Sequence, residues 1–325
     1  MIPPVMISEL TDAHILSDHY RFFKTVEIAH AAGGRQQHVS FAKDNEQPTY
    51  FTTLSLYWKT LLQCMVVDEA TGDIFATQVD HHLNSGEVQS FRIVRLNKNG
   101  EMLDWMACKY GGHGTTLGIE NENGKVYIWS GYQDEQHHYK LVRVPYQPGV
   151  IIDGSEATTY NSFTPYYMTP ITDQKNQRIA FRITDPEGRQ VIELRRLEDV
   201  KKGVNHVLGR LQIPRQYTQT MQGVTIDGES LYWYTGDSNV DGISVPWRII
   251  RFNMRTGKVD GVLKCDFGRE GDGTWRDGFR EPESLYLYTD PHTGQKKLLA
   301  GVVVGKPLKR VNKIYQLPLS AFKSS

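Results

Sequence analysis

One stretch decides the fold: Leu61-Leu-Gln-Cys-Met-Val-Val-Asp-Glu-Ala-Thr-Gly-Asp-Ile-Phe-Ala-Thr-Gln78. Two apolar runs flank a turn rich in Asp and Gly, a pattern that is typical of a β-hairpin. The pattern recurs four times, with copies that start near residues 114, 168, 221 and 281. The five starts are therefore separated by 53, 54, 53 and 60 residues. A nearly constant period of this length indicates a repeat protein.

A second element follows each copy and consists of a short strand in which basic or polar residues alternate with apolar ones. The five examples are Arg92-Ile-Val-Arg-Leu96, Lys140-Leu-Val-Arg-Val144, Val191-Ile-Glu-Leu-Arg195, Arg248-Ile-Ile-Arg-Phe252 and Lys313-Ile-Tyr-Gln-Leu317. A further turn and strand follow four of these, which makes four strands per unit. Four short antiparallel strands per repeat are typical of a propeller blade, whereas parallel solenoids repeat every 20 to 30 residues or so. The sequence predicts an all-β, five-bladed β-propeller.

The fifth copy stops after three strands, so the amino-terminal segment is predicted to supply the missing one and close the ring. Residues 1–50 are expected to hold a lead-in and this ring-closing strand, placed between about 20 and 42. Residues 51–325 are expected to form the propeller. Within the repeats, only Leu197–Gly203 favours a helix, of about one turn.

Charge and composition exclude several classes of partner. Lys plus Arg and Asp plus Glu number 37 each, so we expect no nucleic-acid partner and no attraction to anionic membranes. No apolar run approaches the roughly eighteen residues of a membrane span, and the amino terminus lacks the pattern of a signal peptide. We expect synthesis in the cytoplasm and action outside the cell, within a virion or after release. The three cysteines are expected to be buried thiols.

Several motifs resemble a known family. Leu62-Gln-Cys-Met-Val-Val-Asp68, Met221-Gln-Gly-Val-Thr-Ile-Asp227, Arg280-Glu-Pro-Glu-Ser-Leu285 and Asn312-Lys-Ile-Tyr-Gln-Leu317 are similar to the five-bladed propeller of receptor-binding proteins from phages of Gram-positive bacteria and of teichoic acid biosynthesis protein C. The chain also resembles helveticin-like bacteriocins. The resemblance spans about residues 50 to 320 and implies recognition of a cell-wall glycan such as teichoic acid. The long stem of phage receptor-binding proteins is missing, as is any heptad segment that would hold a homo-oligomer together.

Three loops combine aromatic rings with carboxylates, amides and guanidinium groups, the mixture that binds sugars. They span residues 132–139, 236–247 and 272–281. Trp129 and Trp233 lie within predicted strands and are expected to be core residues. The candidate ligand-binding residues are Tyr132, Asp134, His137, Asp237, Asn239, Trp247, Asp272, Trp275, Arg276 and Asp277.

Asp237-Ser-Asn-Val-Asp-Gly242 copies the opening of a calcium loop, with Asp237, Asn239 and Asp241 as possible ligands. Position twelve is Arg248 where that loop needs Glu, so a plain polar hairpin is the competing interpretation. No other cofactor is expected.

Three functions remain open. The first is glycan recognition without catalysis, and the second is a bacteriocin that binds and kills related bacteria. The third is cleavage of a polysaccharide or teichoic acid, with Asp237, Asp272, Asp277 or Glu283 acting as acid and base. No nucleophile elbow, phosphate loop or dinucleotide fingerprint is present.

Overall fold

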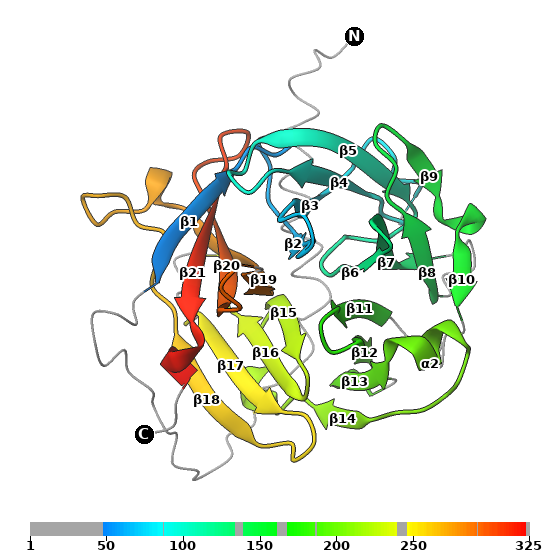
Figure 1. Cartoon of the computed structure of the whole chain (residues 1–325). Coiled ribbons are helices and arrows are strands. Elements are labelled where there is room, and N and C mark those ends of the chain that lie inside the picture. Colours follow the sequence, from blue (N-terminus) through cyan, green and yellow to red (C-terminus); the bar gives the residue numbers. More distant parts are fainter. Residues whose placement is uncertain are drawn as a thin grey trace.

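The computed structural model describes residues 48–86, 88–133, 139–160, 168–185, 187–238, 246–290 and 292–322. Over these residues the chain forms five sheets that stand as blades around a central axis (Figure 1). The predicted five-bladed propeller is confirmed. Within a blade the first strand lies nearest the axis and the fourth lies at the rim (Figure 1).

Each blade contains four antiparallel strands that follow one another from the axis outward. Blade 1 contains β2 (Cys64–Val67), β3 (Ile74–Val79), β4 (Phe91–Leu96) and β5 (Met102–Lys109). Blade 2 contains β6 (Gly118–Glu122), β7 (Lys125–Gln133), β8 (Tyr139–Pro145) and β10 (Thr158–Tyr160). Blade 3 contains β11 (Met168–Asp173), β12 (Arg178–Thr184), β13 (Gln190–Arg196) and β14 (Gly209–Gln212). Blade 4 contains β15 (Met221–Asp227), β16 (Ser230–Thr235), β17 (Arg248–Asn253) and β18 (Val259–Lys264). Blade 5 contains β19 (Arg280–Thr289), β20 (Lys296–Val304), β21 (Val311–Pro318) and β1 (Thr49–Leu54).

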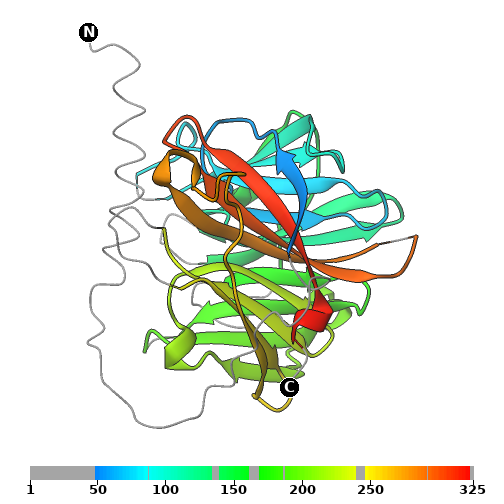
Figure 2. The same cartoon turned by 90° about the vertical axis from the view of Figure 1, so that its left-hand side faces the viewer.

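The ring is closed by β1, which pairs antiparallel with β21 from Thr49↔Gln316 to Leu54↔Asn312. Figure 2 shows the two strands, blue and red, side by side at the edge of blade 5. This position corrects the placement between residues 20 and 42, a segment that lies outside the described residues. The reason is the period itself, since the outermost strand of one blade is followed in the sequence by the innermost strand of the next blade. The connection 55–63 joins β1 to β2 in this way.

Two additions interrupt the regular pattern. β9 (Ile151–Asp153) leaves blade 2 and pairs in parallel with β5, so blade 1 has a fifth strand at its rim. The short helix α2 (Leu197–Lys201) follows β13, as the sequence predicts. Four single turns of 3-10 helix complete the described secondary structure, namely η2 (Gly154–Glu156), η3 (Arg215–Tyr217), η4 (Arg276–Gly278) and η5 (Leu319–Phe322).

The antiparallel order gives the propeller two distinct faces. Turns from the first to the second strand, such as 68–73, lie on one face, which we call the turn face. The described ends of the connections from the second to the third strand, such as 80–90 and 236–247, lie on the opposite face. The connections between blades, such as 55–63 and 265–279, lie there too. We call this second face the loop face.

A repeated Asp or Asn at the end of each innermost strand organises the turn face. Asp68 accepts a hydrogen bond from the amide of Ala70, and Asn121 accepts one from the amide of Gly124. The side-chain amide of Asn121 also donates to Asp68 in the neighbouring blade, at 3.1 and 3.2 Å. Asp227 accepts from the Lys296 Nζ of blade 5. The Asp or Asn at the end of the innermost strand therefore caps its own turn or ties it to the neighbouring blade.

The hydrophobic core lies between the blades. Each of the four clusters that the described residues form joins residues from adjacent sheets, for example Trp233 of blade 4 with Ile192 of blade 3. Trp129 and Trp233 are fully buried, which confirms their predicted core positions. Each indole has a partner, because Trp129 Nε1 donates to Glu120 at 2.9 Å and Trp233 Nε1 donates to the Tyr217 carbonyl at 3.0 Å. Cys64, Cys108 and Cys265 are buried free thiols.

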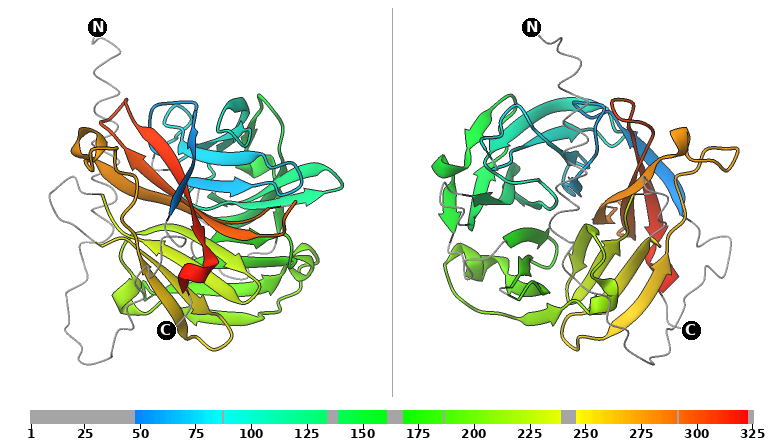
Figure 3. Two further views of the ribbon diagram at one scale, coloured as in Figure 1. Left: turned by 60° about the vertical axis from the view of Figure 1, so that its left-hand side comes forward. Right: turned by 180° about the vertical axis from the view of Figure 1, so that it is seen from behind.

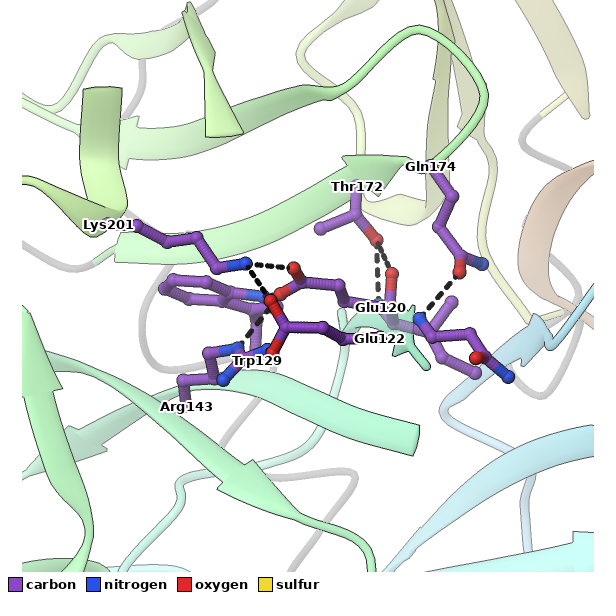
Figure 4. Close-up of polar contacts among 9 residues, drawn as sticks. Glu120, Glu122, Trp129, Arg143, Thr172, Gln174 and Lys201 are labelled. Carbon is purple, nitrogen blue, oxygen red and sulfur yellow. Dashed lines mark hydrogen bonds and ion pairs between the residues drawn. The ribbon is translucent and has the colours of Figure 1, made fainter. Parts of the chain in front are cut away.

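An ionic network spans the seam between blades 2 and 3 (Figure 4). Lys201 of α2 donates to Glu120 and to Glu122, which both lie on β6. Arg143 of β8 bonds the same two carboxylates, at 2.8 and 2.9 Å. Thr172 of β11 completes the seam by bonding the backbone of Ile119 at 2.7 Å in both directions.

Candidate functional site

The described ends of all three predicted ligand-binding loops lie at the loop face, because 132–139 and 236–247 join second to third strands and 272–281 enters β19. Asp134, His137, Asn239 and Asp241 lie outside the described residues. Two of the three possible calcium ligands are therefore not described. Asp237 accepts from the amide of Ser238 at 2.8 Å. Among the described residues, no group of three or more His, Cys, Asp or Glu side chains is arranged to hold a metal ion.

Trp247 is the anchor between the 236–247 and 265–279 connections. It is only 2% exposed, and its indole Nε1 donates to the Asp237 carbonyl at 3.0 Å. Gly236 is required beside it, because a Cβ at that position would lie 2.6 Å from Trp247 Cδ1. The ring packs edge-on against Phe267 and lies 6.3 Å from the ring of Trp275. Because Trp247 is buried, it acts by positioning the residues around it.

Trp275 is the half-buried ring of the site, and two guanidinium groups lie close to it. Arg269 lies 4.2 Å and Arg280 lies 4.1 Å from its ring centroid. Arg280 also lies 4.3 Å from the ring of Trp247. Each contact is within the range of cation–π attraction. We call these four residues, Trp247, Arg269, Trp275 and Arg280, the Trp275 platform.

Asp266 holds both arginines of the platform. Its carboxylate accepts from Arg269 Nη2 at 3.0 and 3.1 Å and from Arg280 Nη1 at 3.1 Å. Partial burial lowers the pKa of Arg280, and the neighbouring Asp266 opposes that shift. Asp266 thus orients both arginines beside the aromatic rings. The 265–279 connection, which carries Arg269 and Trp275, stands out from the rim of the propeller, where Figure 3 shows it in orange.

The remaining predicted residues of this connection shape its turns. Asp272 accepts from the Thr274 amide at 2.9 Å and from its hydroxyl at 2.6 Å, and these bonds lower the pKa of Asp272. Asp277 has a φ of 55° and accepts from the Lys306 amide at 3.3 Å. Arg276 donates to Glu270 at 3.2 Å. All three side chains are exposed on the loop face.

Tyr132 lies apart from the platform, at the end of β7 in blade 2. Its ring is buried against Gly154, where a Cβ would approach Tyr132 Cδ2 to 2.1 Å. The close approach shows that this ring fills space under η2.

Two buried glutamates at the start of β19 form a second polar cluster near the axis. Burial raises the pKa of Glu281 to about 7, with repulsion from Asp237 adding to the shift. Burial and repulsion from Glu281 raise the pKa of Glu283 well above its usual value. Attraction to Arg310 opposes both shifts. The structure thus brings Asp237 and Glu283 of the predicted acid–base set together, and leaves Asp272 and Asp277 on the exposed connection.

Sequence reasoning missed Arg269, Arg280 and Glu281. A signal for the arginines was present in the spacing Arg269…Trp275…Arg280, in which two cations bracket a Trp within one Gly-rich connection. Glu281 stands two residues before Glu283 on the same strand, within a motif that the sequence ties only to the family. Chemically, the site offers a half-exposed aromatic face, fixed cations beside it and buried carboxyl groups that hold protons near neutral pH.

Comparison with known proteins identifies several relatives. The sequence profile described as phage five-bladed β-propeller receptor-binding platform domain matches residues 61–316. A Bacillus subtilis (strain 168) protein described as putative major teichoic acid biosynthesis protein C is 37% identical over 279 residues, which are 83% of this chain and 62% of the relative. The tail fiber of Staphylococcus aureus phage P68 superposes with a TM-score of 0.73 at 26% identity, over 95% of this chain and 57% of the fiber.

The chain therefore spans less than two thirds of the length of either relative. Within the described part of the chain, no helix has the length and apolar character needed to cross a membrane.

Proposed function

Since the chain belongs to the family of phage five-bladed β-propeller receptor-binding platform domains, we propose that it recognises a bacterial cell-surface glycan, a teichoic acid or a similar polymer, through its loop face. Family membership supports a binding role. The glycan as target is our inference from the chemistry of the Trp275 platform and from the 37% identical relative, whose name refers to teichoic acid.

The Trp275 platform is the observation that carries this proposal. A half-exposed Trp ring offers a flat apolar surface to the C–H face of a sugar. Arg269 and Arg276 have exposed side chains beside it and are suited to the phosphate groups of a teichoic acid. Because Asp266 and Trp247 fix the geometry in advance, little conformational entropy is lost when a ligand binds.

We propose recognition without cleavage and without a bound cofactor, by a chain that acts outside the bacterial cell as part of a virion. Support comes from the carboxylates of the loop face. Glu281 and Glu283 are buried, while Asp272 and Asp277 accept hydrogen bonds from turn residues. A glycosidase needs an accessible pair of carboxyl groups on either side of the scissile bond.

The decisive experiment is retention of the purified protein on Gram-positive cell walls, prepared with and without their teichoic acid. We expect retention on intact walls that survives EDTA, and at least tenfold weaker retention after teichoic acid removal. Trp275→Ala should weaken retention to a similar degree. The matched control is Tyr127→Ala, which removes a half-buried ring that also carries an arginine, Arg143 at 3.5 Å, but lies on blade 2 near the turn face.

Equal retention on both wall preparations would contradict the proposal. Release of glycerol phosphate or reducing ends from intact walls would instead show an enzyme, and loss of viability of the bound bacteria would indicate a bacteriocin.

A further inference from the structure

We propose that blade 1 carries a second carbohydrate-binding surface, formed by Tyr57, Trp58 and Trp105, that takes an uncharged pyranose ring. We call these three residues the blade 1 platform. It extends the proposed glycan recognition to a second site, built on different blades from the Trp275 platform. None of its three residues belongs to the three loops that the sequence predicts to bind a ligand.

Three aromatic rings converge on one guanidinium group in this region. Arg92 of β4 lies 4.1 Å from the ring of Tyr57, 4.7 Å from that of Trp58 and 4.2 Å from that of Trp105. The rings also contact one another edge-on, with centroids 4.9 Å apart for Tyr57 and Trp58 and 5.8 Å apart for Tyr57 and Trp105. The connection between β1 and β2 supplies two of the rings, and β5 supplies the third.

Asp80 neutralises the cation at the centre of the cluster. Its Oδ2 accepts from Arg92 Nε at 3.1 Å and from Nη2 at 2.8 Å, and both residues are buried. A buried ion pair with two hydrogen bonds has one favoured geometry, because any displacement leaves a charge without compensation. Arg92 therefore has a fixed position, and the three rings pack against it.

Gln78 fixes the backbone that carries Trp58. The Trp58 amide donates to Gln78 Oε1 at 3.1 Å, and Gln78 Nε2 donates to the Trp58 carbonyl at 3.1 Å and to Thr60 Oγ1 at 2.7 Å. Gln78 is fully buried. The rings are thus ordered before any ligand arrives, which lowers the entropy cost of binding.

The exposure of these rings distinguishes them from the aromatic core of the propeller. Trp129 and Trp233 pack between blades and are fully buried, whereas Tyr57 is 40% exposed and Trp58 and Trp105 are half-buried. The exposed His82 ring lies 6.0 Å from Trp58 and adds a hydrogen-bonding group at the edge. Exposed aromatic rings with a polar edge are typical of binding surfaces.

The charges of the cluster select the kind of ligand. Arg92 already lies within 4.7 Å of the centroids of all three rings, so it would repel a second cation bound to them. Arg92 is buried and donates two hydrogen bonds to Asp80, so its guanidinium is not accessible to a ligand phosphate. A neutral sugar depends on neither a cation nor an anion in the site, because its apolar C–H face packs on an aromatic ring by dispersion.

Fluorine NMR of the 5-fluorotryptophan-labelled protein tests this proposal, because the chain contains 6 Trp residues and each gives one resonance. The probes are methyl glucoside and methyl N-acetylglucosaminide. Single Trp→Phe substitutions assign the spectrum. We expect saturable shifts of Trp58 and Trp105, while the buried Trp129 and Trp233 do not move and so report that the fold is intact.

Variants then separate the two surfaces. Tyr57→Ala should weaken the sugar response of Trp58 and Trp105 about tenfold and leave that of Trp275 unchanged. The matched control Tyr127→Ala should leave all responses unchanged. A sugar response of Trp275 with none at Trp58 and Trp105 would overturn the blade 1 site and leave the proposed function standing. Shifts at Trp58 and Trp105 that persist in Tyr57→Ala would overturn it as well. A response at neither surface, for either sugar, would overturn the blade 1 site, while the cell-wall retention experiment separately decides the proposed function.

Discussion

At the scale of single residues, Trp247 and Trp275 show how one sequence context supports two roles. Both lie in polar, Gly-containing connections, and the sequence predicts both to bind a ligand. Trp247 is buried by its bond to the Asp237 carbonyl and by its contact with Phe267. Trp275 packs against Trp247 and stays half-exposed. The buried ring stabilises the fold, and the exposed ring is available to a ligand.

Substitution of Trp247 should therefore affect stability much more than substitution of Trp275. We expect Trp247→Ala to lower the free energy of unfolding by about 3–5 kcal/mol, as is usual for truncation of a buried Trp. Trp275→Ala should cost less than half of that. Urea denaturation followed by circular dichroism measures both values, and similar losses in the two variants would contradict the assignment of roles.

Glu281 should make the stability of the propeller depend on pH. Its pKa is 4.5 in the unfolded chain and about 7 in the fold, so the folded state holds the proton more tightly between these values. Stability attributable to Glu281 is complete below pH 4.5 and is lost as the pH rises through 7. Relative to the native protein, Glu281→Gln should gain about 2–3 kcal/mol between pH 5 and pH 8.

Denaturation midpoints at several pH values between 5 and 8 check this expectation. Glu187→Gln is the control, because that side chain is 62% exposed on a turn of blade 3. A difference between Glu281→Gln and the native protein that does not change with pH would show that the Glu281 pKa is not raised.

At the scale of elements, α2 acts as a clamp between two blades (Figure 4). Its Lys201 reaches from blade 3 to Glu120 and Glu122 of blade 2. Glu120 is buried and also accepts from Trp129 and Arg143, so the ionic contact extends a network that reaches the core. The helix is only one turn long, and its contribution therefore lies in this side chain and in its buried Leu197 and Val200.

Removal of the clamp should loosen the seam between blades 2 and 3. We expect Lys201→Ala to lower the free energy of unfolding by about 1–2 kcal/mol, less than for a fully buried pair because the lysine is partly exposed. Lys202→Ala is the matched control next to it, since its side chain is 64% exposed and forms an ion pair with the exposed Glu198 of α2. Chemical denaturation at low and high salt measures both, and equal effects would refute the clamp.

At the scale of the whole molecule, the ring depends on one strand from the amino-terminal side. β1 supplies the outermost strand of blade 5, with Leu54 and Thr52 buried against the rest of the propeller. Thr52 Oγ1 also donates to the Asn99 carbonyl of blade 1, at 2.8 Å. β1 therefore joins the last blade to the first.

Deletion of residues 1–54 should open this closure and lower the melting temperature by on the order of 10 °C. A synthetic peptide of residues 48–56, added in excess, should restore part of the loss, because it can pair again with the free edge of β21. Differential scanning calorimetry checks both effects, with a scrambled peptide as the control. A deletion protein that melts like the full chain would show that β1 does not close the ring.

The sequence alone determined the architecture of this protein. The five copies, the third strand of each blade, the helix after β13 and the burial of Trp129 and Trp233 were all predicted correctly. The physical reason is that a blade is built from local hairpins. The alternation of apolar and polar residues and the turn residues that define these hairpins all lie within about fifty residues of chain. Repetition then multiplies that local signal.

Only the tertiary structure decided which side chains meet at a surface. Arg92 gathers Tyr57, Trp58 and Trp105 from separate segments, and Arg280 bridges Trp247 and Trp275 across two blades. The register of β1 against β21 and the burial of Glu281 were equally out of reach. These features depend on how one blade packs against the next. The sequence pattern does not show which distant residues meet where two blades pack together.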